Sequence, residues 1–136
     1  AAAFMLGAVG VQLGTRFLVA KECGVHQNYK NKVLKANDIA TMTTGKRLGH
    51  PVRSIKNPYT KEYFRLEYSS ISDEELEAYG RGALRRAAVE GDEKTGCFLA
   101  GQIAGMVNRE QPAKEIIEEI FREAEDVLNG ATKWVK

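Results

Sequence analysis

The sequence predicts a mostly helical chain of the α/β class. Three observations point to this class: a helix end followed by an apolar strand over residues 1–14, two alternating segments over 38–56 that suit a hairpin, and several amphipathic segments over 57–129. The 136 residues are 43% hydrophobic and 28% charged, which is typical of a folded domain and excludes a disordered chain. No apolar run approaches the roughly 18 residues that cross a membrane.

The first segment has the pattern of one step in a repeating βα fold. Residues 1–7 are rich in alanine and predict a helix end closed by Gly7, and residues 9–14 are apolar on both faces, as in a buried parallel strand. Such a step cannot bury its own faces without neighbouring strands. The chain opens with neither a Met nor a charged leader, so we expect no signal peptide and expect the C-terminal fragment of a longer protein. Residues 15–22 fit either an extension of the strand or a short helix.

The next segment predicts a helix and a hairpin. Asn28 is a plausible N-cap for an amphipathic helix over 28–36. Residues 38–44 and 52–56 suit two strands with one solvated face each, and the intervening Gly45–Gly49 suits a turn.

Two helices follow with clear start signals. Asn57 and Pro58 fit an N-cap with proline in the first turn, which opens a helix to about Tyr68. Ser72 with Glu75 forms a capping box, and its helix ends near Gly80.

Three further helices are predicted over 82–90, over 97–108 and from Pro112 to a stop at Asn129-Gly130. The apolar positions expected to face inward in the first and last of them are Leu84, Ala87, Ala88, Val89, Ile116, Ile117, Ile120, Phe121, Ala124, Val127 and Leu128.

Two glycine-containing segments could carry chemistry. A strand ending in Gly14-Thr15 exposes backbone N–H groups that can bind a phosphate, although glycines there can equally serve a turn. Gly101 and Gly105 each cost a helix about 1 kcal/mol relative to Ala, which indicates close approach by a backbone or a ligand. Helix packing suffices to explain Gly105, whereas the amide of Gln102 lies among small apolar residues and needs partners.

The two cysteines are expected to be reduced thiols in a cytoplasmic protein. Cys23 and Cys97 lack the spacing of a zinc site, so no metal is expected. Cys97 could line a cleft, but no histidine is placed to activate it, and we expect a buried, unreactive thiol.

The charge is unevenly distributed along the chain. Residues 1–68 carry a net charge of +7 and residues 69–136 a net charge of −5. The basic half either steers an acidic partner or is simply a solvated face. It has few aromatic residues and no nucleic-acid recognition motif, so a nucleic-acid partner is not expected.

Several motifs occur in an order that resembles a known family. Gly10–Phe17 is followed by His26–Lys30, Gly49–Asn57, Gly91-Asp92 and Ala100–Gly105. Together they resemble the C-terminal part of the FMN-dependent enoyl-acyl-carrier-protein reductases, which are close relatives of the nitronate monooxygenases, formerly called 2-nitropropane dioxygenases. The resemblance covers residues 1 to about 129.

This resemblance implies a fold. The family has a TIM-type (β/α)₈ barrel that binds FMN, with a small α+β domain inserted after the last strand. Residues 1–23 would then be the end of the barrel, with the end of the seventh helix and the eighth strand. Residues 24–95 would be the inserted domain, with the hairpin and helices, and residues 96–136 would return to the barrel as its last helical layer.

The resemblance also assigns site residues. Gln12, Gly14 and Thr15 would lie at the FMN phosphate, with N–H groups of the last two donating to it, and Gly101 and Gln102 would line the flavin and substrate cleft. The family's catalytic histidine belongs to a Gly-Gly-His segment that would precede Ala1, so no catalytic residue is expected in this sequence. His26 is expected to be a turn residue and His50 a hairpin residue.

The implied function is the reduction of trans-2-enoyl-acyl-carrier-protein by NADH or NADPH in fatty-acid synthesis, with FMN as cofactor. The sequence given is expected to be inactive alone; its partners would be the acyl carrier protein and a second copy in a homodimer, with no nucleic acid or membrane. A nitronate monooxygenase, which oxidises alkyl nitronates with FMN and O₂, is the alternative. His50 within Gly49–Asn57 favours the reductase, because the monooxygenases more often have Arg there. A third alternative is a non-enzymatic interaction fragment.

Overall fold

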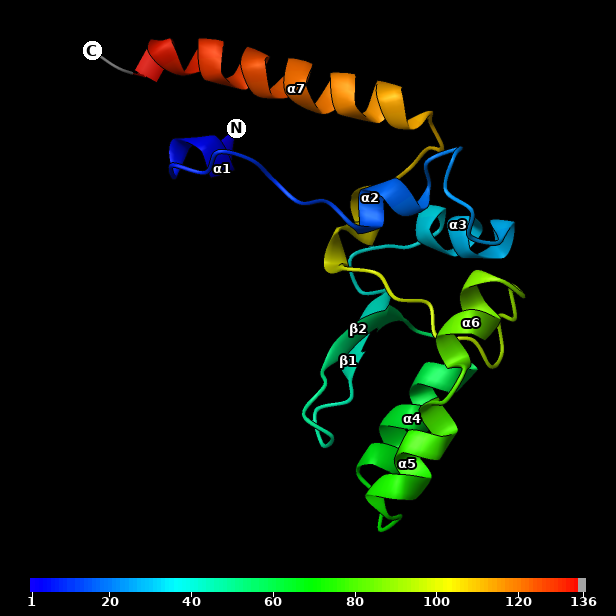
Figure 1. Ribbon diagram of the computed structural model, residues 1–136. Coiled ribbons are helices and arrows are strands. Elements are labelled where there is room, and N and C mark those ends of the chain that lie inside the picture. Colours follow the sequence, from blue (N-terminus) through cyan, green and yellow to red (C-terminus); the bar gives the residue numbers. More distant parts are fainter. Residues whose placement is uncertain (135–136) are drawn as a thin grey trace.

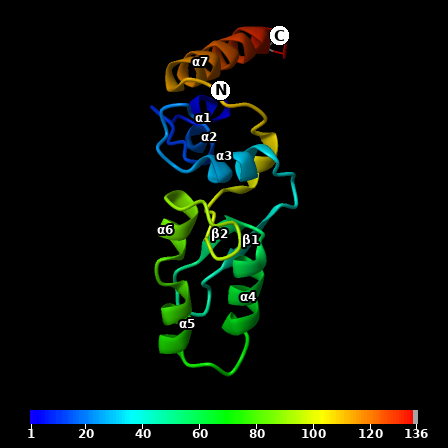
Figure 2. The ribbon, with the colours of Figure 1, turned by 90° about the vertical axis from the view of Figure 1, so that its right-hand side faces the viewer.

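The longest helix forms one end of the molecule and a helix pair forms the other. The computed structural model describes residues 1–134. Helix α7 (Ala113–Gly130) lies at one end, and α4 (Pro58–Glu67) and α5 (Asp73–Gly80) lie at the other (Figures 1 and 2). The remaining elements are α1 (Ala2–Met5), α2 (Thr15–Leu18), α3 (Gln27–Leu34), β1 (Thr41–Thr44), β2 (Val52–Ile55), α6 (Ala83–Ala88) and the 3₁₀ turns η1 (Gln102–Met106) and η2 (Ala131–Trp134). The prediction of a mostly helical chain with a hairpin is confirmed.

No helix in the part of the chain that the structure describes is both long and apolar enough to span a bilayer.

The hairpin is antiparallel and its turn is tied to α4. Thr41 pairs with Ile55 at one end of the ladder. At the turn, Gly45 has φ +80°, and a Cβ there would lie 2.5 Å from the carbonyl oxygen of His50. The buried carboxylate of Glu67 accepts hydrogen bonds from the backbone N–H groups of Gly45 (3.2 Å) and Arg47 (2.9 Å). The predicted hairpin is therefore confirmed, and a side chain of α4 fixes its turn.

A second backbone segment pairs with the other edge of β2. Ile55 N–H donates to the carbonyl of Phe98 (2.8 Å), and Ala100 N–H donates to the carbonyl of Arg53 (3.1 Å). Ser54 and Leu99 form an antiparallel bridge between these two bonds. The helix predicted over 97–108 is therefore wrong, because its first residues are extended and only Gln102–Met106 makes a helical turn. The free edge of β2 offers backbone partners, and the glycines on both sides weaken any helix.

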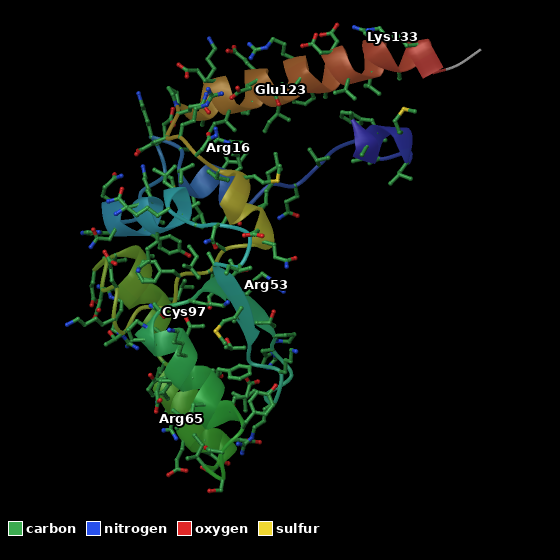
Figure 3. All side chains as sticks on the ribbon, turned by 180° about the vertical axis from the view of Figure 1, so that it is seen from behind. Arg16, Arg53, Arg65, Cys97, Glu123 and Lys133 are labelled. Atoms are coloured by element: carbon green, nitrogen blue, oxygen red, sulfur yellow. The ribbon has the colours of Figure 1, made fainter. Side chains whose placement is uncertain are left out.

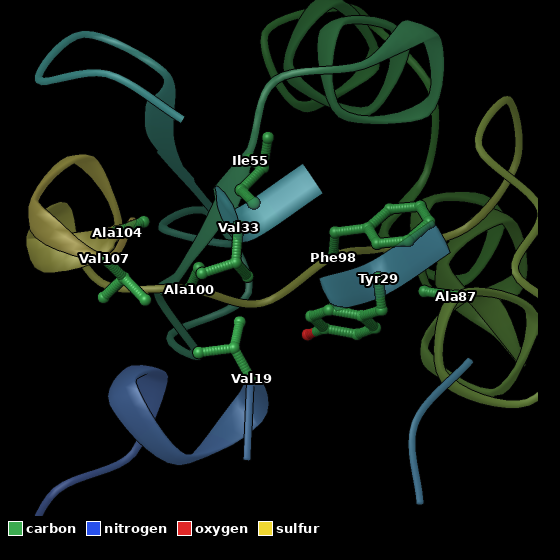
Figure 4. Close-up of a cluster of buried hydrophobic side chains, with 9 residues drawn as sticks. All are labelled: Val19, Tyr29, Val33, Ile55, Ala87, Phe98, Ala100, Ala104 and Val107. Atoms are coloured by element: carbon green, nitrogen blue, oxygen red, sulfur yellow. The ribbon is translucent and has the colours of Figure 1, made fainter. Parts of the chain in front are cut away.

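The paired segment alternates between two hydrophobic cores. Phe98 and Ala100 belong to one cluster, together with Val19, Tyr29, Val33, Ile55, Ala87, Ala104 and Val107 (Figure 4). Cys97 belongs to the other, with Tyr59, Tyr63, Leu76 and Ala83, and Leu99 packs against that second cluster. This alternation is the two-residue period of a strand. The first core draws on residues from all three predicted parts of the chain, and the division at residues 23 and 95 stays a prediction.

The predicted strand over 9–14 is not formed. No strand among the described residues pairs with it, and Val9 and Val11 are exposed. A strand needs a partner for its ladder hydrogen bonds, and in residues 1–134 neither the hairpin nor the isolated bridges Ser54–Leu99 and Ala20–Gln111 include residues 9–14. The alternative for residues 15–22 is decided in favour of a short helix, α2. Gly7 closes α1 with φ +89°, as expected.

The capping predictions are confirmed at α4 and α5 and wrong at α3. Asn57 accepts a hydrogen bond from the N–H of Thr60 (2.8 Å), and Ser72 and Glu75 form both bonds of the capping box. At α3 the cap is His26, whose Nδ1 accepts from the N–H of Asn28 (3.1 Å). The amide of Asn28 instead donates to the carbonyl of Gly91 (2.9 Å), so it links α3 to the loop after α6.

Several predicted inward positions are exposed. Leu84 and Val89 of the α6 region are 49% and 60% exposed, and Ile116 is the one buried residue of α7. The helical spacing in α7 is correct, but its apolar face includes the exposed Ile117, Phe121 and Val127. α7 ends at Gly130, and η2 follows it.

Two glycines allow close backbone contacts around the extended segment. A Cβ at Gly105 would lie 2.7 Å from the carbonyl carbon of Asn37, so packing does require Gly105, although its neighbour is the loop after α3 and not a barrel layer. A Cβ at Gly96 would lie 2.5 Å from the carbonyl oxygen of Asp92 and 2.8 Å from the backbone of Ala87. Both contacts at Gly96 are with backbone atoms, which cannot rotate away.

We predict that Gly96→Ala destabilises the protein by about 1–3 kcal/mol, because the new methyl group forces apart two backbone segments. The measurement is the free energy of unfolding in a denaturant titration. Gly24→Ala is the matched control, since a Cβ at Gly24 meets nothing within 4 Å. Equal stability of the two variants would contradict the packing argument.

Candidate functional site

Two predicted site residues that are 86 positions apart in the sequence meet in the structure. The N–H of Gly101 donates to the side-chain hydroxyl of Thr15, with 2.9 Å between N and Oγ1. Thr15 is the first residue of α2, and Gly101 follows the segment that pairs with β2. The bond therefore joins the N-terminal part of the chain to the edge of the hairpin.

This contact lies at a cleft of about 580 Å³. Its walls come from α2, α3, β2, α6 and the extended segment. They consist of Gly14, Thr15, Leu18, Val25, Tyr29, Val52, Arg53, Leu84, Ala88, Leu99, Ala100 and Gly101. Most of these side chains are apolar and none is acidic, which suits a largely apolar ligand with few polar anchor points.

Two polar side chains of the cleft were missed as site residues by sequence reasoning. The hydroxyl of the buried Tyr29 donates to the carbonyl of Leu99 (2.7 Å), and burial raises the pKa of this phenol, so it stays protonated. The Nη1 of Arg53 donates to Oγ1 of Thr41 (3.2 Å). Both residues lie in motifs that carried the resemblance, His26–Lys30 and Gly49–Asn57. Membership of these motifs was the one feature of the sequence that could have indicated a site role for Tyr29 and Arg53, because the spacing of neither residue is distinctive.

The structure brings together part of the predicted site. Gly14, Thr15 and Gly101 line the cleft, whereas Gln12 and Gln102 are exposed and do not line it. The amide of Gln102 lies in solvent at the start of η1, so it does not need a protein partner.

The glycines of the cleft are sterically open. A Cβ at Gly14 would meet nothing within 4 Å, and one at Gly101 would make ordinary contacts at 3.5 Å with the Thr15 hydroxyl and at 3.7 Å with Ile103. Neither glycine is required by the packing of the described chain, and the open side of each leaves room for a ligand at the cleft.

The histidines and Cys97 lie outside this cleft lining. His26 is the cap of α3 and His50 lies in the hairpin turn, as expected for turn and hairpin residues. Cys97 is buried, and burial raises the pKa of its thiol, with a hydrogen bond to the Ser54 side chain acting in the opposite direction. Figure 3 shows Cys97 and Arg53 near the middle of the molecule. Over residues 1–134 no three His, Cys, Asp or Glu side chains are placed to hold a metal ion.

Comparison with known proteins identifies the family. The family model described as nitronate monooxygenase matches residues 1–123. The chain belongs to the nitronate monooxygenase family. This is a family of FMN-dependent oxidoreductases, and the resemblance found in the sequence motifs is confirmed.

Individual members of the nitronate monooxygenase family cover nearly the whole chain. A probable nitronate monooxygenase of Staphylococcus saprophyticus is 30% identical over 94% of the chain, and one of Bacillus subtilis is 27% identical over 90%. The structure of FabK from Thermotoga maritima matches 98% of the chain, with 40% sequence identity and a TM-score of 0.93. The chain spans 35–36% of the length of those two curated relatives and 42% of the FabK chain.

Proposed function

We propose that this chain supplies the last strand, the inserted domain and the last helical layer of an FMN-binding TIM-type barrel. The activity we propose for the whole protein is the reduction of trans-2-enoyl-acyl-carrier-protein by NADH or NADPH. The observation that carries this proposal is the hydrogen bond between Gly101 and Thr15. It brings a residue predicted at the FMN phosphate and one predicted in the substrate cleft to the same apolar cavity.

The residues of the cleft fit a flavin mononucleotide. Gly14 is open on its Cβ side and lies at the start of α2, where backbone N–H groups can reach a phosphate. The apolar walls suit an aromatic ring system. Bound FMN would supply hydride transfer between a nicotinamide donor and the enoyl thioester. In this scheme Thr15 holds Gly101 in place, Leu18, Val25 and Leu99 exclude water, and Tyr29 fixes the carbonyl of Leu99.

Two observations favour the reductase within the family. Sequence identity is 40% to FabK, an FMN-dependent enoyl-acyl-carrier-protein reductase, and 30% to the nitronate monooxygenase of S. saprophyticus. The segment Gly49–Asn57, with His50, also resembles the reductases.

Oxidation of alkyl nitronates with O₂ is the second candidate, supported by the names of the curated relatives. Two assays on the flavin-loaded protein separate the activities. A reductase oxidises NADH or NADPH in the presence of crotonyl thioester, whereas a monooxygenase consumes O₂ with an alkyl nitronate and needs no nicotinamide. Turnover of the alkyl nitronate with no NADH or NADPH oxidation in the presence of crotonyl thioester would overturn the proposed activity.

We predict that Gly14→Val in the complete protein abolishes FMN binding, because a branched side chain would occupy the approach to the backbone N–H groups. The measurement is bound flavin after gel filtration. Because nothing lies within 4 Å of a Cβ at Gly14, misfolding of the described chain would not explain the loss. Gly24→Val, at an equally open glycine outside the cleft, is the control and retains FMN. Full flavin content in Gly14→Val would remove Gly14 from the site.

We also propose that the basic half of the chain steers an acidic acyl carrier protein. Lys46 lies at the hairpin turn and is exposed, so its charge is free to act at a distance. Screening over about 8 Å at physiological salt makes such attraction salt-dependent. Arg47 is less suitable for a test, because it forms an ion pair with Asp73 and donates to the carbonyls of Ser69 and Ile71.

For Lys46→Glu we expect kcat/KM for carrier-bound substrate to fall several-fold at low salt, while the value for a small thioester is unchanged. Lys114→Glu, on the exposed surface of α7, makes the same change in net charge away from the hairpin and serves as the control; the exposed ion pair with Glu118 that it removes contributes at most about 1 kcal/mol. If both substrates lose activity equally, or if both variants behave alike, the steering proposal fails.

A further inference from the structure

Arg53 is the one cationic residue among those that line the apolar cleft. The other described residues of its lining carry no charge. Arg53 is half-buried, and the one hydrogen bond that its guanidinium makes to the described chain goes to the neutral hydroxyl of Thr41. By contrast, four other arginines, namely Arg47, Arg65, Arg85 and Arg109, form ion pairs with carboxylates.

The backbone holds Arg53 firmly in this position. Arg53 pairs with Thr43 across the hairpin, and its carbonyl accepts the N–H of Ala100 on the other edge of β2. Ala100 is followed by Gly101, which is bonded to Thr15. Arg53 therefore lies on a strand that is hydrogen-bonded along both edges, and Ala100, Gly101 and Thr15 connect it to the predicted phosphate end of the cleft.

The half-buried guanidinium of Arg53 has one neutral hydrogen-bond acceptor, Thr41, and no anionic partner among the described residues, so its charge is unpaired there. A guanidinium presents several N–H donors in a planar fork that matches the oxygens of a phosphate, and the bonds it makes to such an anion are charge-assisted. The acid-free lining means that no protein carboxylate competes for those donors within the cleft. The arrangement is therefore suited to an anionic ligand group rather than to an internal ion pair.

We propose that Arg53 recognises a phosphate group of the substrate or co-substrate in this cleft. The proposal rests on the proposed function, in which the FMN phosphate is assigned to Gly14 and Thr15 and two further molecules carry a phosphate group: the phosphopantetheine arm of the carrier-bound substrate and the pyrophosphate of NADH or NADPH. In both cases the recognised chemistry is a phosphate ester oxygen, and Arg53 acts as a specificity-determining residue.

The test compares probes that differ in their phosphate groups, bound to the flavin-loaded protein and followed by calorimetry. One pair is 4′-phosphopantetheine and pantetheine, and the other is nicotinamide mononucleotide and nicotinamide riboside, so the members of each pair differ by one phosphate. In the wild type, one of the two pairs shows roughly tenfold tighter binding of the phosphorylated member, and that pair identifies the source. In Arg53→Gln the ratio of the two Kd values falls to about one, and in Arg53→Lys it is partly retained, because the charge remains without the fork.

Lys56→Gln is the matched control. Lys56 follows β2, its removal costs the same charge, and its side chain lines a different hollow with Lys32 and Lys35. Equal Kd ratios in the wild type and Arg53→Gln overturn the proposal, as does loss of the ratio in Lys56→Gln. A wild type with no preference in either pair also overturns it. Flavin content and NADH oxidation are measured separately, because they test the proposed function. A protein that binds flavin and oxidises NADH but shows no phosphate preference contradicts only the role of Arg53 and leaves the proposed function standing.

Discussion

The position of residues 97–101 determines how the rest of the chain is arranged. This segment pairs with the free edge of β2 through Phe98 and Ala100, and it ends at Gly101, whose N–H is held by the hydroxyl of Thr15. Each of these hydrogen bonds contributes only about 1 kcal/mol net, but leaving a buried backbone group unpaired would cost more. Because the side chains alternate, Phe98 and Ala100 fill one core while Cys97 and Leu99 face the other. One short extended segment thus separates two cores, and its end meets α2 at the cleft.

The cleft follows from that arrangement. Thr15 and Leu18 come from α2, Tyr29 comes from α3 and Arg53 from β2, and the paired segment brings all of them to one cavity. Supporting contacts keep these elements in register. The ammonium group of the buried Lys30 donates to the carbonyl of Ala20 (2.8 Å) and to Glu110 (2.9 Å), which ties α3 to the chain on both sides of the segment. Glu67 holds the hairpin turn against α4. The chemistry proposed for the cleft therefore depends on residues supplied by distant parts of the sequence.

Local signals in the sequence were sufficient where the interaction is local. The caps at Asn57 and Ser72 and the glycine turn of the hairpin depend on neighbours within a few residues, and all three were predicted. The helix predicted over 97–108 failed because a long-range partner, the edge of β2, outweighed short-range propensity. Residues 9–14 are apolar, as predicted, but they form no strand because no partner strand lies beside them. The apolar positions of α7 recur at helical spacing, as predicted, but much of that face is exposed. Gly14, Thr15 and Gly101 were singled out by their glycine patterns and given their roles by the family resemblance, whereas the place of Arg53 and Tyr29 in the cleft required the fold.

Amide hydrogen exchange at Gly101 reports directly on the hydrogen bond to Thr15 on which the cleft depends. The account predicts that the Gly101 amide is protected in the wild-type protein, and that Thr15→Val, which removes the acceptor with little change in shape, speeds its exchange by roughly an order of magnitude. The amide of Ile55, which donates to Phe98 on the other side of the pairing, would keep its protection in the same variant. Rapid exchange at Gly101 in the wild type, or exchange that is unaffected by Thr15→Val, would contradict the claim that this bond joins α2 to the end of the paired segment at the cleft.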